Sequence, residues 1–411
     1  MPKLSVLLLW SLLTTGIHAY SYPSVNTVHR LARRPLSPVR MSVLTIDGST
    51  LEGGGQILRN AFAYAALLNK PLRVFNIRAG RSKPGLANQH LESIRLLSRI
   101  SHGKLGGDQV GSVQVTFWPN TIVAGKYAAD PGTAGSITLM IQAVMWPCLC
   151  LGAEVQLDLR GGTDVSFSPP LDYLTIVLRP LLRSFGADFD LTLHKRGFYP
   201  KGGGHVTVNL HPPPTRPLQP ITLLSKGTLS QIRGLAYTSG AVNPSNADHM
   251  KASLVQALKK GDPAVRRVDM SIETVHLDPQ VAVGSASGLW VCAETTEGCR
   301  YFANAEGKKD VQPSETARQV AASLIDQLSQ NGCVDEHTQD QLIMPMSLAL
   351  GTSRILCGPL TLHTRTAMWV AETLTDAKFK ITESPTVDGV GRVEGAVLLE
   401  CEGIGWGAER E

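Results

Sequence analysis

The chain has 411 residues, of which 43% are hydrophobic and 18% are charged, and its formal net charge is +5. This composition is that of an ordinary globular protein, and it excludes a disordered or collagen-like chain. The small basic surplus permits a polyanionic partner without requiring one. Seven scattered cysteines without a Cys-x-x-Cys pair favour buried thiols in a reducing compartment over a disulfide framework.

Residues 1–41 have the features of a leader. Lys3 precedes the apolar run 4–13, and the stretch 30–40 carries four arginines without an acid. This pattern is typical of a signal or transit peptide, or of a disordered lead. The apolar run is too short to span a bilayer, so we expect no stable membrane association. Met41 lies just before the first strand-like segment and is an alternative start, so we exclude residues 1–41 from the fold.

From residue 43, short apolar strands alternate with Gly-rich turns and longer apolar helices. The predicted strands cover residues 44–46, 72–74, 155–159, 187–193, 205–210 and 397–401. The predicted helices cover residues 56–68, 137–149, 170–185 and 341–350. The recurrence of strand–helix–strand units predicts several α/β layers that share one architecture.

The composition and the pattern of predicted elements change between residues 211 and 333. A proline-rich exit at 212–220 is typical of a stiff, extended connection. The following segment has its own predicted strands and helices, at 231–237, 291–295, 246–260 and 314–330. We therefore predict a small α/β domain at 211–333, inserted into a large domain made of residues 42–210 and 334–411.

Two runs of three glycines are the most unusual local features. Gly53–Gly55 follows Glu52, and Gly202–Gly204 follows Lys201. Consecutive glycines are costly in backbone entropy, so they indicate a sharp turn or a close approach to other chain or to a ligand. Either run alone is most simply a tight turn. Together, and beside charged residues, they favour sites that handle an anionic substrate.

Several common active-site motifs are missing. The chain has no Walker loop, and no Gly-x-Gly-x-x-Gly opens a helix after a strand. It also lacks a Gly-x-Ser-x-Gly elbow and a His-Glu-x-x-His helix, which argues against α/β-hydrolases and zinc proteases.

A basic stretch is a candidate phosphate site. Arg78 and Arg81 flank Gly80, and His90 lies where a helix opens. Two guanidinium groups three residues apart can face one phosphate, and a helix start adds backbone N–H groups and a favourable dipole. The alternative is a solvated loop with scattered arginines.

His363 is a candidate nucleophile. We expect it at the end of an alternating strand, before a helix over 368–374, where the helix dipole favours a neutral ring. A purely structural histidine is the alternative. Asp340, expected at a helix start, and Glu52 could hold a divalent metal or polar ligand atoms, or cap a helix.

The motifs together resemble those of a known family. Residues 196–206 (Arg-Gly-Phe-Tyr-Pro-Lys-Gly-Gly-Gly-His-Val) resemble the signature of RNA 3′-terminal phosphate cyclases, and residues 47–59 resemble its N-terminal motif. Further similar segments, in the family's order, are 78–90, 132–136, 161–163, 335–342 and 361–367. The resemblance covers nearly all of residues 43–411. It implies an α/β (α+β) fold with three repeated units, each akin to the C-terminal domain of translation initiation factor three, plus the smaller inserted α/β domain.

The resemblance also implies an activity. Family members use ATP to convert an RNA 3′-terminal phosphate to a 2′,3′-cyclic phosphodiester, through a histidine–AMP intermediate and an RNA-adenylate. The partners expected are therefore ATP and an RNA with a 3′-phosphate end, with Mg²⁺ or Mn²⁺ to neutralise charge. The family suggests the nucleus (nucleoplasm) or the cytoplasm, whereas the leader suggests another destination.

The resemblance assigns roles to residues by position. His363 matches the adenylated nucleophile, and Glu52 matches the metal-linked acid. The positions that hold the nucleotide are Gln142, Pro169, His337, Asp340 and Gln341. The positions that face the phosphates and the RNA end are Arg59, Arg78, Arg81 and His90. His337 replaces the usual tyrosine, and its ring can still stack on adenine.

Three other classes of protein are alternatives. The cyclase-like factors of ribosomal RNA processing share the fold but lack the histidine nucleophile, so His363 favours the enzyme. Enolpyruvyl transferases share the architecture but usually have six units, for which this chain is too short. A pure RNA-binding module is disfavoured by the aromatic content of 6%, because stacking on a long strand needs many exposed rings.

Overall fold

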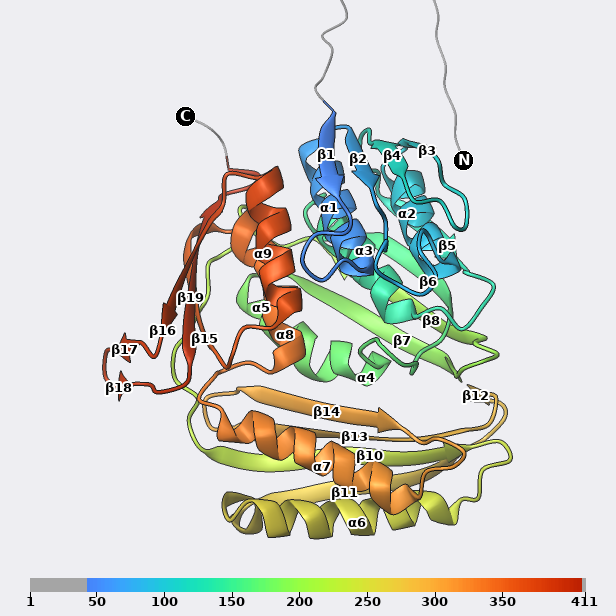
Figure 1. Ribbon diagram of the computed structural model, residues 1–411, viewed down its shortest axis with the longest axis vertical. Coiled ribbons are helices and arrows are strands. Elements are labelled where there is room, and N and C mark those ends of the chain that lie inside the picture. Colours follow the sequence, from blue (N-terminus) through green and yellow to red (C-terminus); the bar gives the residue numbers. More distant parts are fainter. Residues whose placement is uncertain (1–42, 409–411) are drawn as a thin grey trace, which may run out of the picture. The chain divides into compact units, whose positions relative to one another are not determined.

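The computed structural model describes residues 43–408 as a mixed α/β fold with four main sheets (Figure 1). The predicted leader at 1–41 lies outside the described residues. Each of the four sheets contains a parallel pair of strands, joined by a segment with a helix, and continues with antiparallel strands. The predicted α/β class is confirmed. The equivalence of three units to one another, and the division into a large and an inserted domain, stay predictions.

The first sheet has the strand order β1-β2-β4-β3, with β1 and β2 parallel. Its strands are β1 (Leu44–Asp47), β2 (Leu72–Phe75), β3 (Lys104–Gly106) and β4 (Val115–Trp118). Helices α1 (Gly55–Leu68) and α2 (Asn88–Ile100) follow β1 and β2. The amphipathic pattern of α2 explains its position, because its apolar face is buried while residues such as Arg99 remain partly exposed.

The second sheet has the order β12-β7-β8-β6-β5. Its strands are β5 (Gly125–Ala129), β6 (Val155–Gly161), β7 (Asp188–Gly197), β8 (Gly204–His211) and β12 (Ala282–Val283). Its helical segments are α3 (Ile137–Leu149), α4 (Leu171–Tyr173), the π-helical η1 (Leu174–Leu178) and α5 (Arg179–Ser184). The long predicted helix 170–185 is therefore one helical run with a π-turn inside it.

The third sheet has the order β16-β19-β15-β9. Its strands are β9 (Thr222–Leu223), β15 (Leu350–Cys357), β16 (Lys378–Glu383) and β19 (Val397–Ile404), and a separate hairpin is formed by β17 (Thr386–Val387) and β18 (Gly391–Arg392). Helices α8 (Glu336–Leu348) and α9 (Leu362–Leu374) flank β15 along the chain. Because β9 pairs with β15, the chain between them leaves this sheet and returns to it.

The fourth sheet lies in that excursion and has the order β11-β10-β13-β14. Its strands are β10 (Leu229–Ser239), β11 (Asp269–Leu277), β13 (Ala286–Thr295) and β14 (Arg300–Glu306). Its helices are α6 (Ser245–Gly261), the short η2 (Ala264–Arg267) and α7 (Pro313–Ser329). Figure 1 shows α6 and α7 side by side on one face of this sheet, where they share an apolar core with it.

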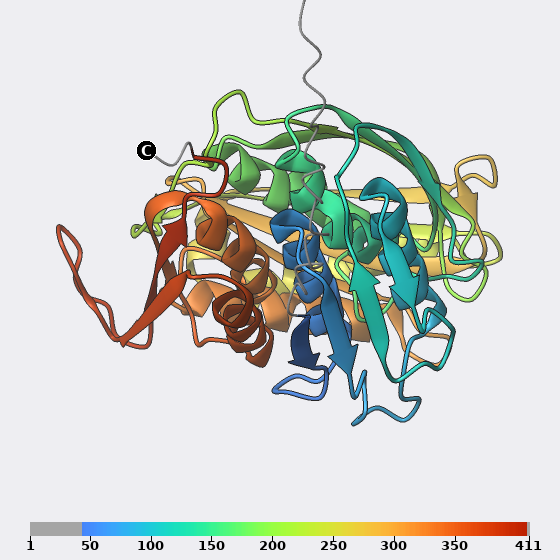
Figure 2. The same ribbon diagram turned by 90° about the horizontal axis from the view of Figure 1, so that it is seen from above.

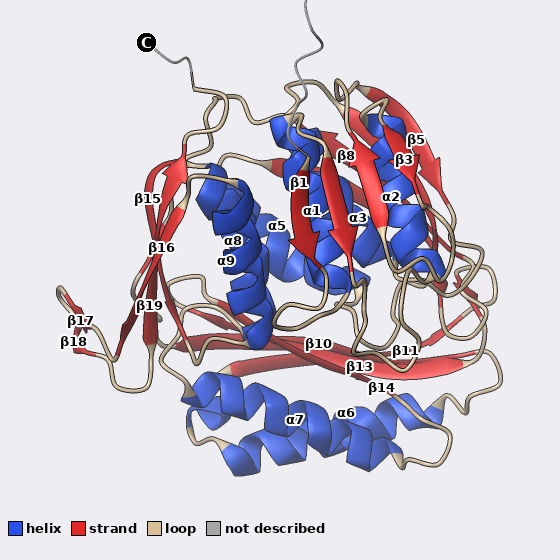
Figure 3. Ribbon diagram, turned by 45° about the horizontal axis from the view of Figure 1, so that its top comes forward, coloured by secondary structure: helices blue, strands red, loops and turns tan. Residues whose placement is uncertain are grey.

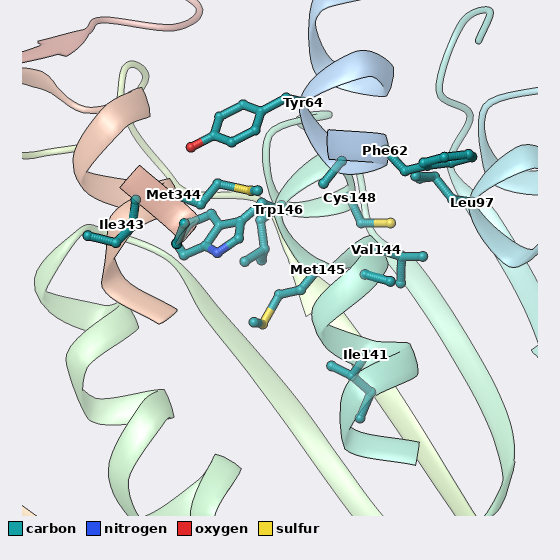
Figure 4. Packing of buried hydrophobic residues seen from close by; sticks show 14 of the residues in the cluster. Phe62, Tyr64, Leu97, Ile141, Val144, Met145, Trp146, Cys148, Ile343 and Met344 are labelled. Carbon is teal, nitrogen blue, oxygen red and sulfur yellow. The ribbon is translucent and has the colours of Figure 1, made fainter. Parts of the chain in front are cut away.

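The other three sheets surround a group of helices. Figures 2 and 3 show α1, α3, α8 and α9 between these sheets, and α1 packs against both α3 and α9. The sequence of α3 has no charged residue and is apolar apart from Thr138 and Gln142, so the helix is buried almost completely. Figure 4 shows Met145 and Trp146 of α3 among side chains from α1, α2 and α8. All seven cysteines are buried and free, as predicted.

Helices α8 and α9 both begin earlier than predicted. α8 begins at Glu336 because Asp335 caps it, its carboxylate accepting a hydrogen bond of 2.6 Å from the Thr338 N–H. Asp340 is consequently in the second turn of α8 and not at its start.

Within residues 43–408, no helix is long and apolar enough to cross a lipid bilayer.

Candidate active site

The N-terminal ends of α1, α8 and α9 lie together. Gln56 in the first turn of α1 hydrogen-bonds the Nδ1 atom of His363 in the first turn of α9, at 3.0 Å. Gln339 of α8 accepts a hydrogen bond of 3.3 Å from the backbone N–H of Thr361, which caps α9. These side-chain contacts fix the three helix starts relative to one another.

The N-terminal ends of α2 and α3 join the same group. Gln89 of α2 accepts a hydrogen bond of 2.7 Å from the backbone N–H of Ser136, the N-cap of α3. The ring of His90, also on α2, lies directly against Gly55 of α1. Five helices therefore point their positive ends at one region, and such ends stabilise anions such as phosphates.

The first glycine run makes room for two site side chains. A β-carbon on Gly54 would overlap the Glu52 carboxylate, and one on Gly55 would overlap the His90 ring. Gly53 also has a positive φ of 62°, which favours glycine. The run between β1 and α1 thus lets both side chains approach the α1 backbone, and it was predicted to lie at a substrate site.

His363 lies inside α9 and not at the end of a strand. Thr361 caps this helix, since its hydroxyl accepts a hydrogen bond of 3.1 Å from the Thr364 N–H, so α9 begins at Leu362. The prediction of a helix starting at residue 368 was wrong for this reason. The His363 side chain is exposed, so a substrate in solution can reach the ring.

The contacts of Gln56 decide which nitrogen of His363 carries the hydrogen. The Gln56 amide nitrogen donates to a carboxylate oxygen of Asp340, so the amide oxygen faces His363. An oxygen can only accept, so Nδ1 carries the hydrogen whenever the ring is neutral. In that form Nε2 has a free lone pair, which a nucleophilic imidazole requires.

Asp340, which accepts the hydrogen bond from the Gln56 amide, is partly buried. Burial raises the pKa of its carboxyl to about 6, although the nearby His363 and Arg59 act in the opposite direction. The carboxylate is therefore ionised at neutral pH and can orient Gln56. Below pH 6 it takes up a proton, and its hold on the amide weakens.

His90 has the opposite tautomer to His363. Its Nδ1 accepts a hydrogen bond of 3.2 Å from the Ala87 N–H, so a neutral His90 carries its hydrogen on Nε2. Burial, with added repulsion from Arg59 and Arg78, lowers the pKa of His90 to about 3. The ring stays neutral at physiological pH and offers an N–H donor beside two guanidinium groups. Arg78 in turn holds the Gly85 carbonyl at 2.8 Å.

Glu52 and Arg81 form an ion pair at the same place. A guanidinium nitrogen of Arg81 contacts one carboxylate oxygen of Glu52. The other oxygen, Oε2, is buried without a hydrogen-bond partner. The backbone N–H of Glu52 donates to the Thr366 hydroxyl of α9 at 3.2 Å, so this loop is fastened to the histidine-bearing helix.

The predicted nucleotide residues on α3 and α8 are connected. Gln142 donates to the Gln341 side-chain oxygen at 2.9 Å. The Gln341 amide nitrogen donates to the His337 carbonyl at 2.9 Å and to the Tyr173 hydroxyl at 3.3 Å. His337 is exposed one helical turn before Gln341, so its ring is open to a ligand.

Pro169 joins this group through α3. Its carbonyl accepts a hydrogen bond of 2.8 Å from Thr138, which lies one turn before Gln142. A small cavity of about 30 Å³ opens between the helices that carry these residues. The cavity is lined by Gln56, Arg59, Asn60, Gln142, Met145, Trp146, Asp340, Gln341 and Met344. It is far smaller than a nucleotide, so it marks only the inner edge of a binding site.

The second glycine run has a different environment. A β-carbon on Gly202 would lie 2.7 Å from the Thr133 carbonyl oxygen, and one on Gly204 would lie 2.8 Å from the Gly161 carbonyl oxygen. The obstacles are mainly backbone atoms, so the run allows three chain segments to pack closely. The close approach was predicted, but the neighbour is the chain itself.

Comparisons with known proteins support one family. The family model for RNA 3′-terminal phosphate cyclase matches residues 50–381. A probable RNA 3′-terminal phosphate cyclase of Dictyostelium discoideum is 39% identical, over 88% of this chain and 83% of its own. The cyclase of Drosophila melanogaster is 37% identical, over 88% and 97% of the two chains. That of Ignicoccus hospitalis is 34% identical, over 89% and 99%. The chain belongs to the RNA 3′-terminal phosphate cyclase family.

The sequence of this cyclase-family chain did not reveal two residues of the site. Gln56 orients His363, and Gln339 connects the starts of α8 and α9. A glutamine at the end of a glycine run was a weak signal for Gln56. Its two partners lie 284 and 307 residues away along the chain, so only the fold reveals its role.

A divalent cation was also predicted for the cyclase site. Within residues 43–408, no group of three or more histidine, cysteine or acidic side chains is placed to hold one. The single carboxylate of Glu52, with its unpartnered buried Oε2, nevertheless fits such an ion. Mg²⁺ commonly keeps several waters and binds through one or two carboxylates plus substrate phosphates.

Proposed function

We propose that this chain is an ATP-dependent enzyme that converts an RNA 3′-terminal phosphate to a 2′,3′-cyclic phosphodiester. In the first step, Nε2 of His363 attacks the α-phosphorus of ATP. A phosphorus–nitrogen bond forms, and the bond to the β-phosphate oxygen breaks to release pyrophosphate. Gln56 keeps Nδ1 protonated by accepting its hydrogen bond, so the attacking lone pair stays on Nε2.

The second and third steps transfer the AMP and close the ring. An oxygen of the RNA 3′-phosphate attacks the adenylyl phosphorus, and Nε2 of His363 leaves. The 2′-hydroxyl then attacks the 3′-phosphorus, loses its proton and expels AMP. Each step is a displacement with a good leaving group, so catalysis depends mainly on positioning and charge neutralisation.

The positive groups of the site suit that task. Arg59 of α1, Arg78 of the loop before α2 and the N–H of His90 on α2 lie near one another. Two charged guanidinium groups and the N–H of a neutral imidazole can hold a phosphate without exchanging protons with it. We assign them, with Arg81, to the phosphates and the RNA end.

We assign Glu52 to the cation. A bound Mg²⁺ or Mn²⁺ would supply neutralisation of the phosphate charge. Glu52 would hold it through Oε2, while Arg81 retains the other carboxylate oxygen. Gly54 keeps the space beside that carboxylate free.

The observation that carries this proposal is the state of His363. An exposed imidazole has Nδ1 engaged by Gln56, at the meeting point of five helix starts. A non-catalytic factor has no need of a histidine held in this tautomer.

Labelling with ATP tests the proposal. We expect the purified chain to acquire label from α-labelled ATP with Mg²⁺, and to pass it to RNA with a 3′-phosphate. His363→Ala should remove the label while the fold is retained in a thermal melt. His249→Ala is the matched control, because His249 is exposed on α6, the helix that packs on the fourth sheet. Persistent labelling of His363→Ala would refute the nucleophile, and an unlabelled wild-type chain would favour the non-catalytic factor.

A further inference from the structure

Phe167 has an unusual exposure and backbone conformation. Its side chain is fully exposed, more than any other large hydrophobic side chain among residues 43–408. Its backbone has a positive φ of 64°, a region that bulky residues rarely adopt. The backbone conformation costs free energy, and residues strained in this way cluster at active sites and ligand clamps.

The loop that carries Phe167 is held on both sides. The Ser166 hydroxyl donates to the Glu306 carboxylate of β14 at 2.9 Å. The Ser168 hydroxyl donates to the Val165 carbonyl at 2.8 Å. The ring is therefore presented by a fixed loop, and the fourth sheet contributes one of its supports.

The position of this loop connects it to the nucleotide residues. Pro169 is two residues further along, and its carbonyl is held by Thr138 of α3. Gln142, one turn beyond Thr138, belongs to the network that includes Gln341 and His337. Phe167 is therefore in the loop that leads into Pro169, one of the residues that we assign to ATP.

We propose that Phe167 is a binding residue on which a nucleobase stacks. The proposal rests on the function proposed above, which brings two bases to the site: the adenine of ATP and the terminal base of the RNA. Stacking on an aromatic ring tolerates any base, because every base has a π-face. The loop that carries the ring is already held by hydrogen bonds, so little backbone entropy is lost when the base arrives.

Two kinetic measurements distinguish the two bases. The first is the KM for ATP in self-adenylation without RNA. The second is the KM for 3′-phosphate RNA at saturating ATP, with either a normal or an abasic terminal nucleotide. We expect Phe167→Ala to raise one of these KM values by about 5- to 150-fold, with little change in kcat. An effect on ATP alone identifies adenine, and an effect on normal but not abasic RNA identifies the terminal base.

Further variants separate stacking from apolar bulk. Phe167→Trp should retain wild-type KM values, whereas Phe167→Leu should behave like Phe167→Ala. Val390→Ala removes another exposed apolar side chain, in the β17–β18 hairpin, and should change neither KM. Ser166→Ala should give a smaller rise, because it frees the loop from Glu306.

Unchanged KM values for Phe167→Ala, or full activity of Phe167→Leu, would overturn the proposal. The wild-type chain and His363→Ala are assayed alongside. If the wild-type chain is labelled and Phe167→Ala behaves normally, only the stacking role fails. If the wild-type chain is not labelled, the proposed function itself fails.

Discussion

The two glycine runs look alike in the sequence and do different things in the fold. At Gly53–Gly55 the absent β-carbons leave space for side chains, namely the Glu52 carboxylate and the His90 ring. At Gly202–Gly204 they leave space mainly for the backbone of neighbouring segments. A glycine run therefore indicates that other atoms approach the backbone closely. Whether those atoms are site side chains or neighbouring backbone decides whether the run serves a site or the packing of the fold.

The comparison predicts opposite outcomes for substitutions near the two runs. Changes at the first run should reduce activity and leave the fold largely intact. Changes at the second run should reduce stability.

The largest effect is expected at Gln56, which follows the first run. Gln56→Met keeps the size of the side chain but removes both hydrogen bonds, so Nδ1 of His363 is no longer held as the donor. We expect the rate of self-adenylation to fall by about 10³-fold, in the range for losing the group that orients a catalytic histidine. Single-turnover labelling measures it. Gln56→Glu is the companion variant, because its carboxylate still accepts from Nδ1 but repels Asp340, and it should recover part of the rate. A normal rate in Gln56→Met would contradict the orienting role.

The next effect is expected at Gly202 in the second run. Gly202→Ala places a methyl group against the Thr133 carbonyl at a residue whose φ is +64°. Overpacking and the left-handed backbone together should lower the free energy of unfolding by about 2–4 kcal/mol. Gly186→Ala is the control, because Gly186 also has a positive φ of 86° but has open space around it. Denaturant unfolding should show the smaller loss for Gly186→Ala, and equal losses would show that backbone crowding is unimportant.

Gly55 gives the complementary result at the first run. In Gly55→Ala the methyl group displaces the His90 ring, which is a movable side chain. We expect a loss of about 10²-fold in RNA cyclisation, as for a misplaced site group. The free energy of unfolding should change little, because alanine is the better helix former in α1. A stability loss as large as that of Gly202→Ala, with activity retained, would erase the distinction between the runs.

The smallest effect concerns the pH dependence of stability at His90. Its pKa is lowered to about 3 in the folded chain, so the unfolded chain binds a proton first as pH falls below 6.5. Stability contributed by the neutral ring is therefore present above pH 6.5 and is lost progressively toward pH 3. Between pH 7.5 and 5.5, the wild-type chain should lose up to about 1.4 kcal/mol more than His90→Asn. Unfolding experiments at the two pH values measure both losses. If the wild-type chain and His90→Asn lose the same stability, the pKa of His90 is not lowered in the folded chain.

Local patterns predicted much of the fold. The mainly apolar sequence 137–149 predicted the helix α3, and the glycine runs indicated close approaches. The starts of α8 and α9 were misplaced although Asp335 and Thr361 are ordinary N-cap residues. Their signal was present in the sequence but was weaker than the apolar periodicity that followed it.

The site was predicted as a set of residues without their connections. Most of the predicted residues are joined by direct contacts, but the Arg81–Glu52 pair and the Gln142–Gln341 bond depend on segments far apart in the chain. The tautomers of His363 and His90 follow from hydrogen bonds to Gln56 and Ala87. No periodicity in a sequence encodes such contacts, because they depend on how the helices are brought together.

The most direct test of the central claim is to locate the adenylyl group. The chain is incubated with ATP and Mg²⁺, digested under mild alkaline conditions and analysed by peptide mass spectrometry. We predict one AMP on the peptide containing His363, attached by an acid-labile phosphorus–nitrogen bond. An AMP on any other residue, such as Lys83 in the basic loop, would contradict the assignment of His363 as the nucleophile.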